Sequence, residues 1–363
     1  MNVTMRDIAK KAEVSSAAVS YVLNNKSVSS RITDETKEKI LRISKELKYR
    51  PNQIAISLTQ KRTKTIGVVF TNARGTFMNE IIDGIDSVTH HHEYNLFLCI
   101  SDDDWQKEAR YIQTLRERRV DGMIVFFVSC RKGEKVNHDH LLEVKKDGIP
   151  LVFVDRYLPD TDIDYVVTDD FAGAHDAVTH LIKLGHKKIA HVTSEDDCTS
   201  FKNRLEGYKS ALIDAGLKIN EEYIKTENSE DNCYRIIQEL IKMKERPSAI
   251  FTSKDGEGII AFKVIKELGL NVPEDIALIS FGNEDKCAHL EVPLTAVDQP
   301  KSEMGEKGAE LLINKIENPE ANFEQITIKP KLIIRQSCGA GERFSYETGQ
   351  KLPREGVSKG HAL

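Results

Sequence analysis

Eight short apolar runs, separated by stretches of helical periodicity, constrain the fold of this chain more than any other feature. They are Ile66 to Phe70, Leu96 to Ile100, Met123 to Val128, Leu151 to Val154, Tyr165 to Val167, Ile189 to Val192, Ala249 to Phe251 and Ile276 to Phe281. Near-continuous apolar strands alternating with amphipathic helices are typical of parallel sheets covered on both faces. The acidic stretch from Asp160 to Asp164 suggests a boundary between two similar halves. We therefore expect two doubly wound α/β lobes, with a ligand cleft at the carboxyl ends of their strands.

The N-terminal segment follows a different pattern, in which apolar residues recur at roughly helical spacing. Those residues are Ile8, Ala9, Ala12, Val14, Val19, Val22 and Leu23. Thr4 with Asp7 resembles a capping arrangement, and Ser15 can cap a second helix after a tight turn. Because the turn is too short for parallel packing, the second helix should cross the first steeply, as in a helix-turn-helix. A plain helical hairpin that packs on another element is the alternative.

A third amphipathic helix is predicted from Thr33 to Leu47, with apolar side chains that can close a small three-helix core. The candidates for that core are Ile40, Leu41, Ile43 and Leu47.

The distribution of charge supports a DNA-binding role for this N-terminal segment, the head. Up to Lys64 the chain carries 14 Lys and Arg against 6 Asp and Glu, a net charge of +8, whereas the whole chain has −5 and the remainder therefore −13. A basic head on an acidic body is expected where one end neutralises phosphates. A solvated basic face without a function is the alternative.

Length and composition indicate a protein with several cores and no membrane span. The chain has 363 residues, of which 40% are hydrophobic and 30% charged, enough for two or three domains. It has no apolar run near the roughly 20 residues of a membrane helix and no secretion signal, so we expect a cytoplasmic location. Its six cysteines form no CxxC pair, and reduced thiols are expected. No cofactor and no metal site is predicted, since the acidic clusters lack EF-hand spacing.

The segment after the third helix predicts a hinge. Pro51 suits the first turn of a helix, so Asn52 to Leu58 could form about two turns. Isolated helices this short are marginal in water. The hinge should therefore become ordered only when another surface packs on it, which could switch the coupling between head and body.

Several motifs, taken in order along the chain, resemble the lactose/galactose repressor family of bacterial transcription regulators. They are VSSAAVSYVLN in the second helix, YRPNQIAISL at the hinge, RRVDGMIV and IPLVFVDR in the first lobe, VVTDDFAGAHDAVTHLIKLGHKKIAHV, RLEGYKSAL and PSAIFTSKD in the second, and VPEDIALISFGN with PLTAVDQP near the end. The resemblance extends from Thr4 to about Ser337. It implies a homodimer that reads a palindromic operator and a body of the periplasmic-binding-protein type, with two lobes joined by three crossings.

The resemblance also implies which residues contact DNA. Ser16 and Ala17 match positions that select bases, and Ser20 lies on the phosphate side. Tyr21 stands where many members carry an arginine that reads guanine, so the operator should differ at that step. The hinge positions that match family contacts to the groove or backbone are Asn52, Ala55 and Leu58, and the resemblance implies that Leu58 wedges between central base pairs. Small or capping residues on a packed helix are the alternative interpretation for the second helix.

By the same resemblance, eight side chains match positions in the effector cleft. They are Phe77, Met78, Asp102, Asp155, Arg204, Glu230, Asp255 and Asn283. Arg204 is the strongest candidate, because a guanidinium forms forked contacts with hydroxyls or a carboxylate. Asp155 and Asp255 could instead be helix caps or loop anchors, and Phe77 could belong to the core.

Two departures from the family pattern bear on the effector. Gly282 replaces the aspartate that normally accepts hydrogen bonds from ligand hydroxyls, and Glu230 falls near a position where relatives often place a stacking ring. A plain hexose is therefore less favoured. Carbohydrate remains the leading ligand class, while a sugar phosphate or another charged or related metabolite, a nucleoside or a protein co-regulator stays open.

The resulting domain expectation divides the chain into four parts. Residues 1–48 form the DNA-binding head, 49–64 the hinge and linker, 65–338 the effector-binding and dimerisation body, and 339–363 a flexible tail. The first lobe is expected at 65–162 and 292–325, and the second at 163–291 and 326–338. A repressor controlled by an effector is the leading function. A cytoplasmic solute-binding protein without a DNA role is the alternative, and the absence of a P-loop or nucleophile elbow argues against an enzyme.

Overall fold

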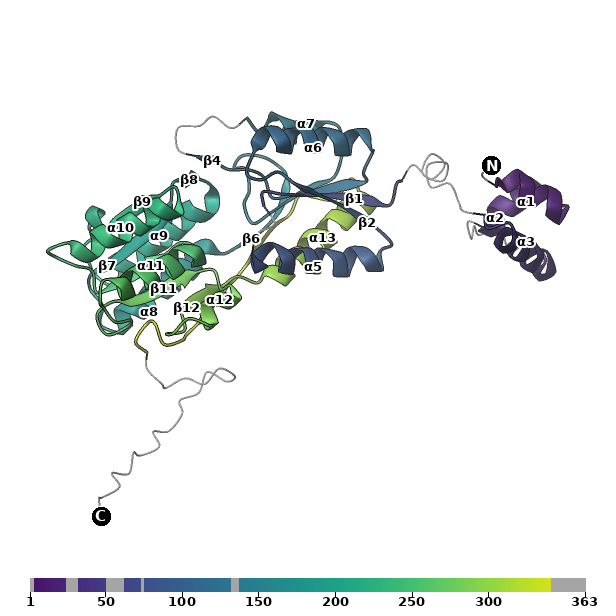
Figure 1. Cartoon of the computed structure of the whole chain (residues 1–363). Coiled ribbons are helices and arrows are strands. Elements are labelled where there is room, and N and C mark those ends of the chain that lie inside the picture. Colours follow the sequence, from purple (N-terminus) through teal and green to yellow (C-terminus); the bar gives the residue numbers. More distant parts are fainter. Residues whose placement is uncertain (1–2, 24–31, 50–61, 73–74, 132–136, 341–363) are drawn as a thin grey trace, which may run out of the picture. The chain divides into compact units, whose positions relative to one another are not determined.

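A computed structural model of the chain describes residues 3–23, 32–49, 62–72, 75–131 and 137–340 (Figure 1). The chain divides into two compact units, Met1–Thr63 and Lys64–Leu363. The expected hinge helix and the expected mobile tail after residue 340 lie outside the described residues.

The N-terminal unit contains three helices, α1 (Met5–Ala12), α2 (Ser16–Leu23) and α3 (Asp34–Glu46). The predicted capping box is present, because Asp7 Oδ2 accepts the Thr4 N–H at 2.8 Å and Thr4 Oγ1 accepts the Asp7 N–H at 3.4 Å. The core of this unit consists of Ile8, Ala9, Ala12, Val19, Ile40 and Ile43. Leu41 was wrongly expected in it and is 51% exposed.

The first lobe of the body is built on a six-stranded sheet in the order β13-β6-β5-β3-β1-β2, with every neighbouring pair parallel. Its strands are β1 (Thr65–Phe70), β2 (Asn95–Ile100), β3 (Gly122–Val125), β5 (Leu151–Val154), β6 (Asp164–Thr168) and β13 (Gln325–Ile328). The helices α5 (Thr76–His91) and α13 (Lys301–Glu317) cover one face, and α6 (Trp105–Glu117) and α7 (Asp139–Lys146) cover the other (Figure 1).

The second lobe repeats this arrangement on a six-stranded sheet in the order β14-β12-β11-β10-β7-β9. Its strands are β7 (Ile189–Ser194), β9 (Ile224–Glu227), β10 (Ala249–Thr252), β11 (Ala277–Phe281), β12 (Thr295–Asp298) and β14 (Lys331–Ile333), of which only β14 runs antiparallel to its neighbour. Its helices are α8 (Asp170–Lys183), α9 (Thr199–Asp214), α10 (Glu230–Lys242), α11 (Asp255–Glu267), α12 (Asp285–Ala288) and the 3₁₀ helix η2 (Glu221–Tyr223).

The chain crosses between the lobes after β6, after β12 and after β13, which matches the expected three crossings. The expected lobe boundaries are wrong in detail. Strands β6 and β13 belong to the first sheet, where they pair with each other, and β12 belongs to the second sheet, where it pairs with β11. A short antiparallel pair, β4 (Cys130–Arg131) with β8 (Asp196–Asp197), also joins the lobes.

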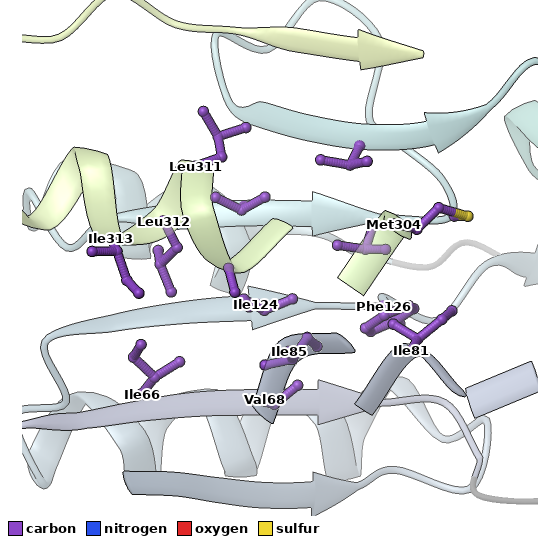
Figure 2. Close-up of a cluster of buried hydrophobic side chains, with 14 of the residues drawn as sticks. Ile66, Val68, Ile81, Ile85, Ile124, Phe126, Met304, Leu311, Leu312 and Ile313 are labelled. Carbon is purple, nitrogen blue, oxygen red and sulfur yellow. The ribbon is translucent and has the colours of Figure 1, made fainter. Parts of the chain in front are cut away.

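Helices α5 and α13 approach each other closely, and their apolar side chains form one core with the sheet. Figure 2 shows Ile81 and Ile85 of α5 facing Ile124 of β3 and Phe126, which directly follows β3. A Cβ added to Gly84 would collide with the carbonyl oxygen of Ser302 on α13. The side chain is therefore excluded at this position, because only glycine lets the two backbones come this close.

None of the described helices is long and apolar enough to cross a membrane.

Candidate functional site

The N-terminal turn of α2 presents the side chains predicted to read bases. Glu13, in the left-handed region with φ 58°, ends α1, and Ser15 Oγ accepts the Ala18 N–H at 3.1 Å to start α2. Buried Val19 anchors the helix, whereas Ser16 and Ala17 are exposed. The geometry therefore leaves the start of α2 available to a major groove. Of the other predicted contacts on α2, Ser20 and Tyr21 are half-buried, and the predicted hinge contacts Asn52, Ala55 and Leu58 lie outside the described residues.

A cavity of about 260 Å³ is lined by residues of both lobes. Six of the eight predicted cleft residues line it: Phe77, Met78, Asp155, Arg204, Asp255 and Asn283. Phe77 also packs against the first-lobe core, so both interpretations of this side chain hold. Asp102 and Glu230 do not line it. Asp102 forms an ion pair with Lys107, and exposed Glu230 starts α10.

Arg204 lies at the centre of the second-lobe wall and is only 5% exposed. Its Nε donates to Asp170 Oδ1 at 2.7 Å and its Nη1 to the Ser253 carbonyl at 2.7 Å. The guanidinium also stacks 3.8 Å from the centre of the Phe281 ring. Burial raises the pKa of Asp170 to about 6, and the positive charge of Arg204 opposes that rise. Two of the three guanidinium nitrogens, Nε and Nη1, therefore donate to groups of the second lobe.

Asp155 contributes a second fixed carboxylate from the end of β5. Its Oδ2 accepts from Arg156 Nε at 3.2 Å and Nη2 at 2.9 Å, and Arg156 Nη1 donates to Ser129 Oγ at 3.2 Å. Its backbone has φ 75°, in the region that non-glycine residues rarely adopt. The Asp155 carbonyl accepts from Ser200 Oγ at 3.0 Å, which ties the first lobe to α9 of the second. The interpretation of Asp155 as a helix cap is therefore not supported.

The loop after β11 supplies carboxylates despite the glycine at position 282. Gly282 has φ 91°, and a Cβ there would lie 3.0 Å from Asp255 Oδ2. Asp255 and Glu284 both line the cavity. Burial raises the pKa of both carboxyl groups, while the Gly256 N–H, at 2.8 Å from Asp255 Oδ1, stabilises the charged form of Asp255. Acceptors for ligand hydroxyls are therefore present next to the position where the family carries aspartate.

Two lysines that the sequence interpretation missed also line the cavity. Lys254 Nζ lies 2.6 Å from Glu227 Oε1 and 3.6 Å from Glu257 Oε1. Lys301 Nζ lies 3.0 Å from Glu80 Oε1. Lys254 directly precedes a predicted cleft residue within the PSAIFTSKD motif, whereas no signal in the sequence pointed to Lys301.

Asn283 is held by a further network, because its Nδ2 donates to Asp298 Oδ1 at 3.2 Å and its Oδ1 accepts from Arg335 at 2.8 Å.

Phe201 was also missed, and it provides the aromatic surface that the sequence did not locate. It lines the cavity on α9, and its ring centre lies 5.4 Å from the Arg204 guanidinium and 5.3 Å from Lys254 Nζ. Aromatic faces beside polar groups are typical of sites that bind the apolar faces of ring-shaped ligands. The expectation of a missing stacking ring near Glu230 therefore does not hold for the cleft as a whole.

A three-helix head joined to a two-lobe α/β body with a polar cleft defines a ligand-binding regulator with a DNA-reading domain. Residues 4–52 match the family described as bacterial regulatory proteins, lacI family, and residues 178–338 match the periplasmic binding protein-like domain. The ribose operon repressor of Haemophilus influenzae is 31% identical over 335 residues, which cover 92% of this chain and 98% of that protein. The HTH-type transcriptional repressor PurR of Mannheimia succiniciproducens is 32% identical with the same coverage.

Among solved structures, a complex of the transcriptional regulator CelR with cellobiose is 26% identical. The matched region covers 93% of this chain and 100% of the CelR chain, with a TM-score of 0.69. The chain therefore belongs to the lacI family of bacterial regulatory proteins, and it is a DNA-binding transcription regulator.

Proposed function

We propose that this protein is a cytoplasmic repressor that binds a palindromic operator as a homodimer and responds to an uncharged, carbohydrate-related effector in the cleft. It acts by binding and not by catalysis, and it needs no cofactor. The observation that carries this proposal is the presence, in one chain, of an exposed recognition helix and a polar cleft between two lobes.

The charges of the cleft support an uncharged effector. Among the described lining residues, each cation already lies beside a carboxylate: Arg204 by Asp170, Arg156 by Asp155, Lys254 by Glu227 and Lys301 by Glu80. The charges of these cations are therefore already neutralised, so the cost of desolvating an anionic ligand would not be offset. Carboxylates, amides and a guanidinium instead suit hydroxyl groups, which both donate and accept hydrogen bonds. The relatives include a ribose operon repressor and a regulator in complex with cellobiose.

The proposed mechanism couples the cleft to DNA through the hinge. Ligand binding changes the balance between arrangements of the two lobes, and this changes how well the paired hinge segments order on the operator. Leu58 is proposed to wedge into the central minor groove, with Asn52 and Ala55 beside it. Ser16, Ala17, Ser20 and Tyr21 are proposed to contact the half-site in the major groove.

The test is selection of DNA from a random pool by the full-length protein at near-physiological salt. We expect enrichment of one palindrome. The variant Tyr21→Arg should select a different base at one position of each half-site, because arginine forms a forked contact with guanine that tyrosine cannot make. A matched control is Tyr111→Arg, since Tyr111 lies on α6 of the body.

Unchanged palindromes from the Tyr21→Arg protein would refute the assignment of this side chain. Failure of the parent protein to enrich any sequence, with or without added sugars, would favour the solute-binding alternative.

A further inference from the structure

A second cavity adjoins the one already described and contains the only tryptophan of the chain. It has a volume of about 280 Å³ and is lined by Trp105, Asp103 and Asp196, among others. It shares five lining residues with the first cavity: Thr71, Asn72, Arg156, Phe201 and Lys254. Because the walls are shared, the two cavities form one elongated cleft with two compartments.

The three aspartates of the loop before α6, Asp102 to Asp104, make different contacts. Asp104 Oδ1 accepts the N–H groups of Gln106 at 2.8 Å and Lys107 at 3.1 Å, so it caps α6 and fixes Trp105 as the first helical residue. Asp102 pairs with Lys107. Asp103 remains to line the second cavity, held by its N–H bond to the Thr71 carbonyl at 2.9 Å.

The backbone of this loop is strained in a way that favours a binding role. Asp102 and Asp103 have φ of 55° and 58°, and consecutive non-glycine residues in this region are energetically unfavourable. Such strain persists where the surrounding structure enforces it, and it is often found at ligand sites. In this loop Asp103 lines the second cavity, whereas the Asp102 carboxylate pairs with Lys107.

The opposite wall of the second cavity comes from the other lobe. Asp196 lies in β8, which pairs with β4, so its position depends on the contact between the lobes. Ser129 adds a hydroxyl next to Arg156. Trp105 thus stands with two carboxylates and one hydroxyl around a space that continues past Phe201 into the first cavity.

The size of the cleft indicates more than one ring. Pockets that bury small organic ligands measure about 300–1,000 Å³. Each compartment alone falls just below that range, and the two together fall within it. A flat indole beside hydroxyl acceptors matches a sugar ring, whose axial C–H groups lie on the aromatic face while its hydroxyls reach the polar side chains.

We propose that the second compartment binds a second sugar ring, so that the effector is an uncharged disaccharide, with Trp105 stacking on the outer ring and Asp103 and Asp196 accepting from its hydroxyls. This inference rests on the proposed carbohydrate effector and specifies its size. A nucleoside also has two linked rings, but its base has a fixed set of donors and acceptors. The side chains of this compartment include acceptors, Asp103 and Asp196, and donors, Arg156 and Lys254, and hydroxyl groups can satisfy both kinds.

The experiment uses the full-length protein and a panel of matched sugars: glucose with cellobiose, maltose and trehalose, and galactose with lactose and melibiose, together with ribose and adenosine. Affinities come from calorimetry. Emission of Trp105 is recorded in parallel, and because the chain has one tryptophan the signal reports this compartment alone. We expect one disaccharide to bind roughly tenfold or more tightly than either of its component sugars and to change the emission.

The variants Asp103→Asn and Asp102→Asn form a matched pair, because they make the same chemical change at adjacent positions. Asp103→Asn should weaken the disaccharide roughly tenfold, the effect of losing a hydrogen bond to a charged group, and leave monosaccharide binding unchanged. Asp102→Asn should leave both unchanged, since Asp102 does not line the cleft.

The outcomes separate this inference from the proposed function. Monosaccharide binding as tight as disaccharide binding, with unchanged Trp105 emission, would overturn the second subsite while the carbohydrate effector stands. Adenosine binding in preference to all sugars would overturn the sugar assignment of both compartments. Binding of none of the probes would overturn the carbohydrate effector and this inference with it, whereas operator selection would still test the DNA role.

Discussion

At the scale of single residues, Arg204 illustrates how a cleft side chain can serve stability and binding together. Replacement by alanine leaves Asp170, 3% exposed, without its cation. Removing one partner of a buried ion pair costs about 3–5 kcal/mol, because the remaining charge stays buried. We expect Arg204→Ala to lower the free energy of unfolding by that amount in urea titrations and to abolish effector binding.

The control for this prediction is Arg116→Ala. Arg116 also forms two ion pairs, with Glu143 at 2.9 Å and Asp147 at 2.6 Å, but its carboxylate partners are half-exposed. Surface pairs contribute about 0–1 kcal/mol. Equal destabilisation by the two substitutions would show that burial of the Arg204 pair is not the cause.

The buried carboxyl group of Glu257 predicts a loss of stability as the pH rises from about 5 to about 8. Burial raises its pKa to about 8, and the negative charge of Glu227 adds to this while Lys254 opposes it. A carboxyl group with a raised pKa in the folded state stabilises that state below its unfolded pKa. This stabilisation is lost as the pH rises through the folded value. We expect the melting temperature of the parent to fall from about pH 5 to about pH 8 and to level off above that, as measured by calorimetry.

The variant Glu257→Gln should remove much of that fall, because an amide at this position cannot ionise. Its Oε1 can still accept the Lys254 N–H that Glu257 Oε2 accepts at 3.0 Å. The same change at Glu267, which is half-exposed at the end of α11, serves as the control. A decline of the same size in the Glu257→Gln and parent proteins would argue against titration of Glu257.

The site residues that belong to a family motif were predictable, whereas those whose position depends on the conformation of a loop were not. Arg204 belongs to the RLEGYKSAL motif, so the resemblance located it. The side chain of Asp103, not Asp102, lines the second cavity, because two left-handed residues turn the loop in a way that no sequence spacing shows. Phe201 was missed because a single aromatic residue near the start of a helix is equally compatible with a core position.

At the scale of secondary structure elements, the contact between α5 and α13 predicts an asymmetric response to added methyl groups. Gly84→Ala would force a Cβ against the Ser302 carbonyl, so α5 and α13 would have to separate. Overpacking of this kind costs about 1–3 kcal/mol. We expect a clear fall in the urea midpoint of the body.

The matched control is Gly256→Ala on α11, where an added Cβ meets nothing within 4 Å. Alanine in a helix is favoured over glycine by about 0.5–1 kcal/mol, so this variant should be as stable as the parent or slightly more so. Loss of stability in both variants would mean that helix packing is not what requires glycine at position 84.

The elements themselves were predictable to the extent that each has an apolar run. All eight predicted strands are present, as β1, β2, β3, β5, β6, β7, β10 and β11. The other strands lack such a run, as in Gln325–Ile328, where exposed and half-buried residues alternate. Their pairing could not be read from the sequence either, because β13 joins β6 across a separation of about 160 residues. Long-range pairing of this kind is decided by packing and not by local pattern.

At the scale of the whole molecule, binding at the cleft and binding at the operator must be linked if the proposed function is correct. The linkage is reciprocal, so the factor by which effector changes operator affinity equals the factor by which operator changes effector affinity. Typical coupling amounts to about 5–150-fold. We expect a factor in this range, measured by calorimetry of the full-length protein with sugar, in the presence and absence of its selected palindrome.

The closing contacts between the lobes are the structural basis on which the effector can act. The two lobes are joined by the hydrogen bond from Ser200 Oγ to the Asp155 carbonyl and by the β4–β8 pair, and both lobes line the cleft. A ligand that contacts both walls therefore favours the arrangement in which these contacts are made. A ligand shifts an equilibrium only by its differential affinity for the two states. Arg204→Lys is the informative variant, because lysine keeps the charge beside Asp170 but cannot fork. It should retain operator binding and lose the response to sugar. A response to sugar that persists unchanged in the Arg204→Lys protein would place the effector outside this cleft.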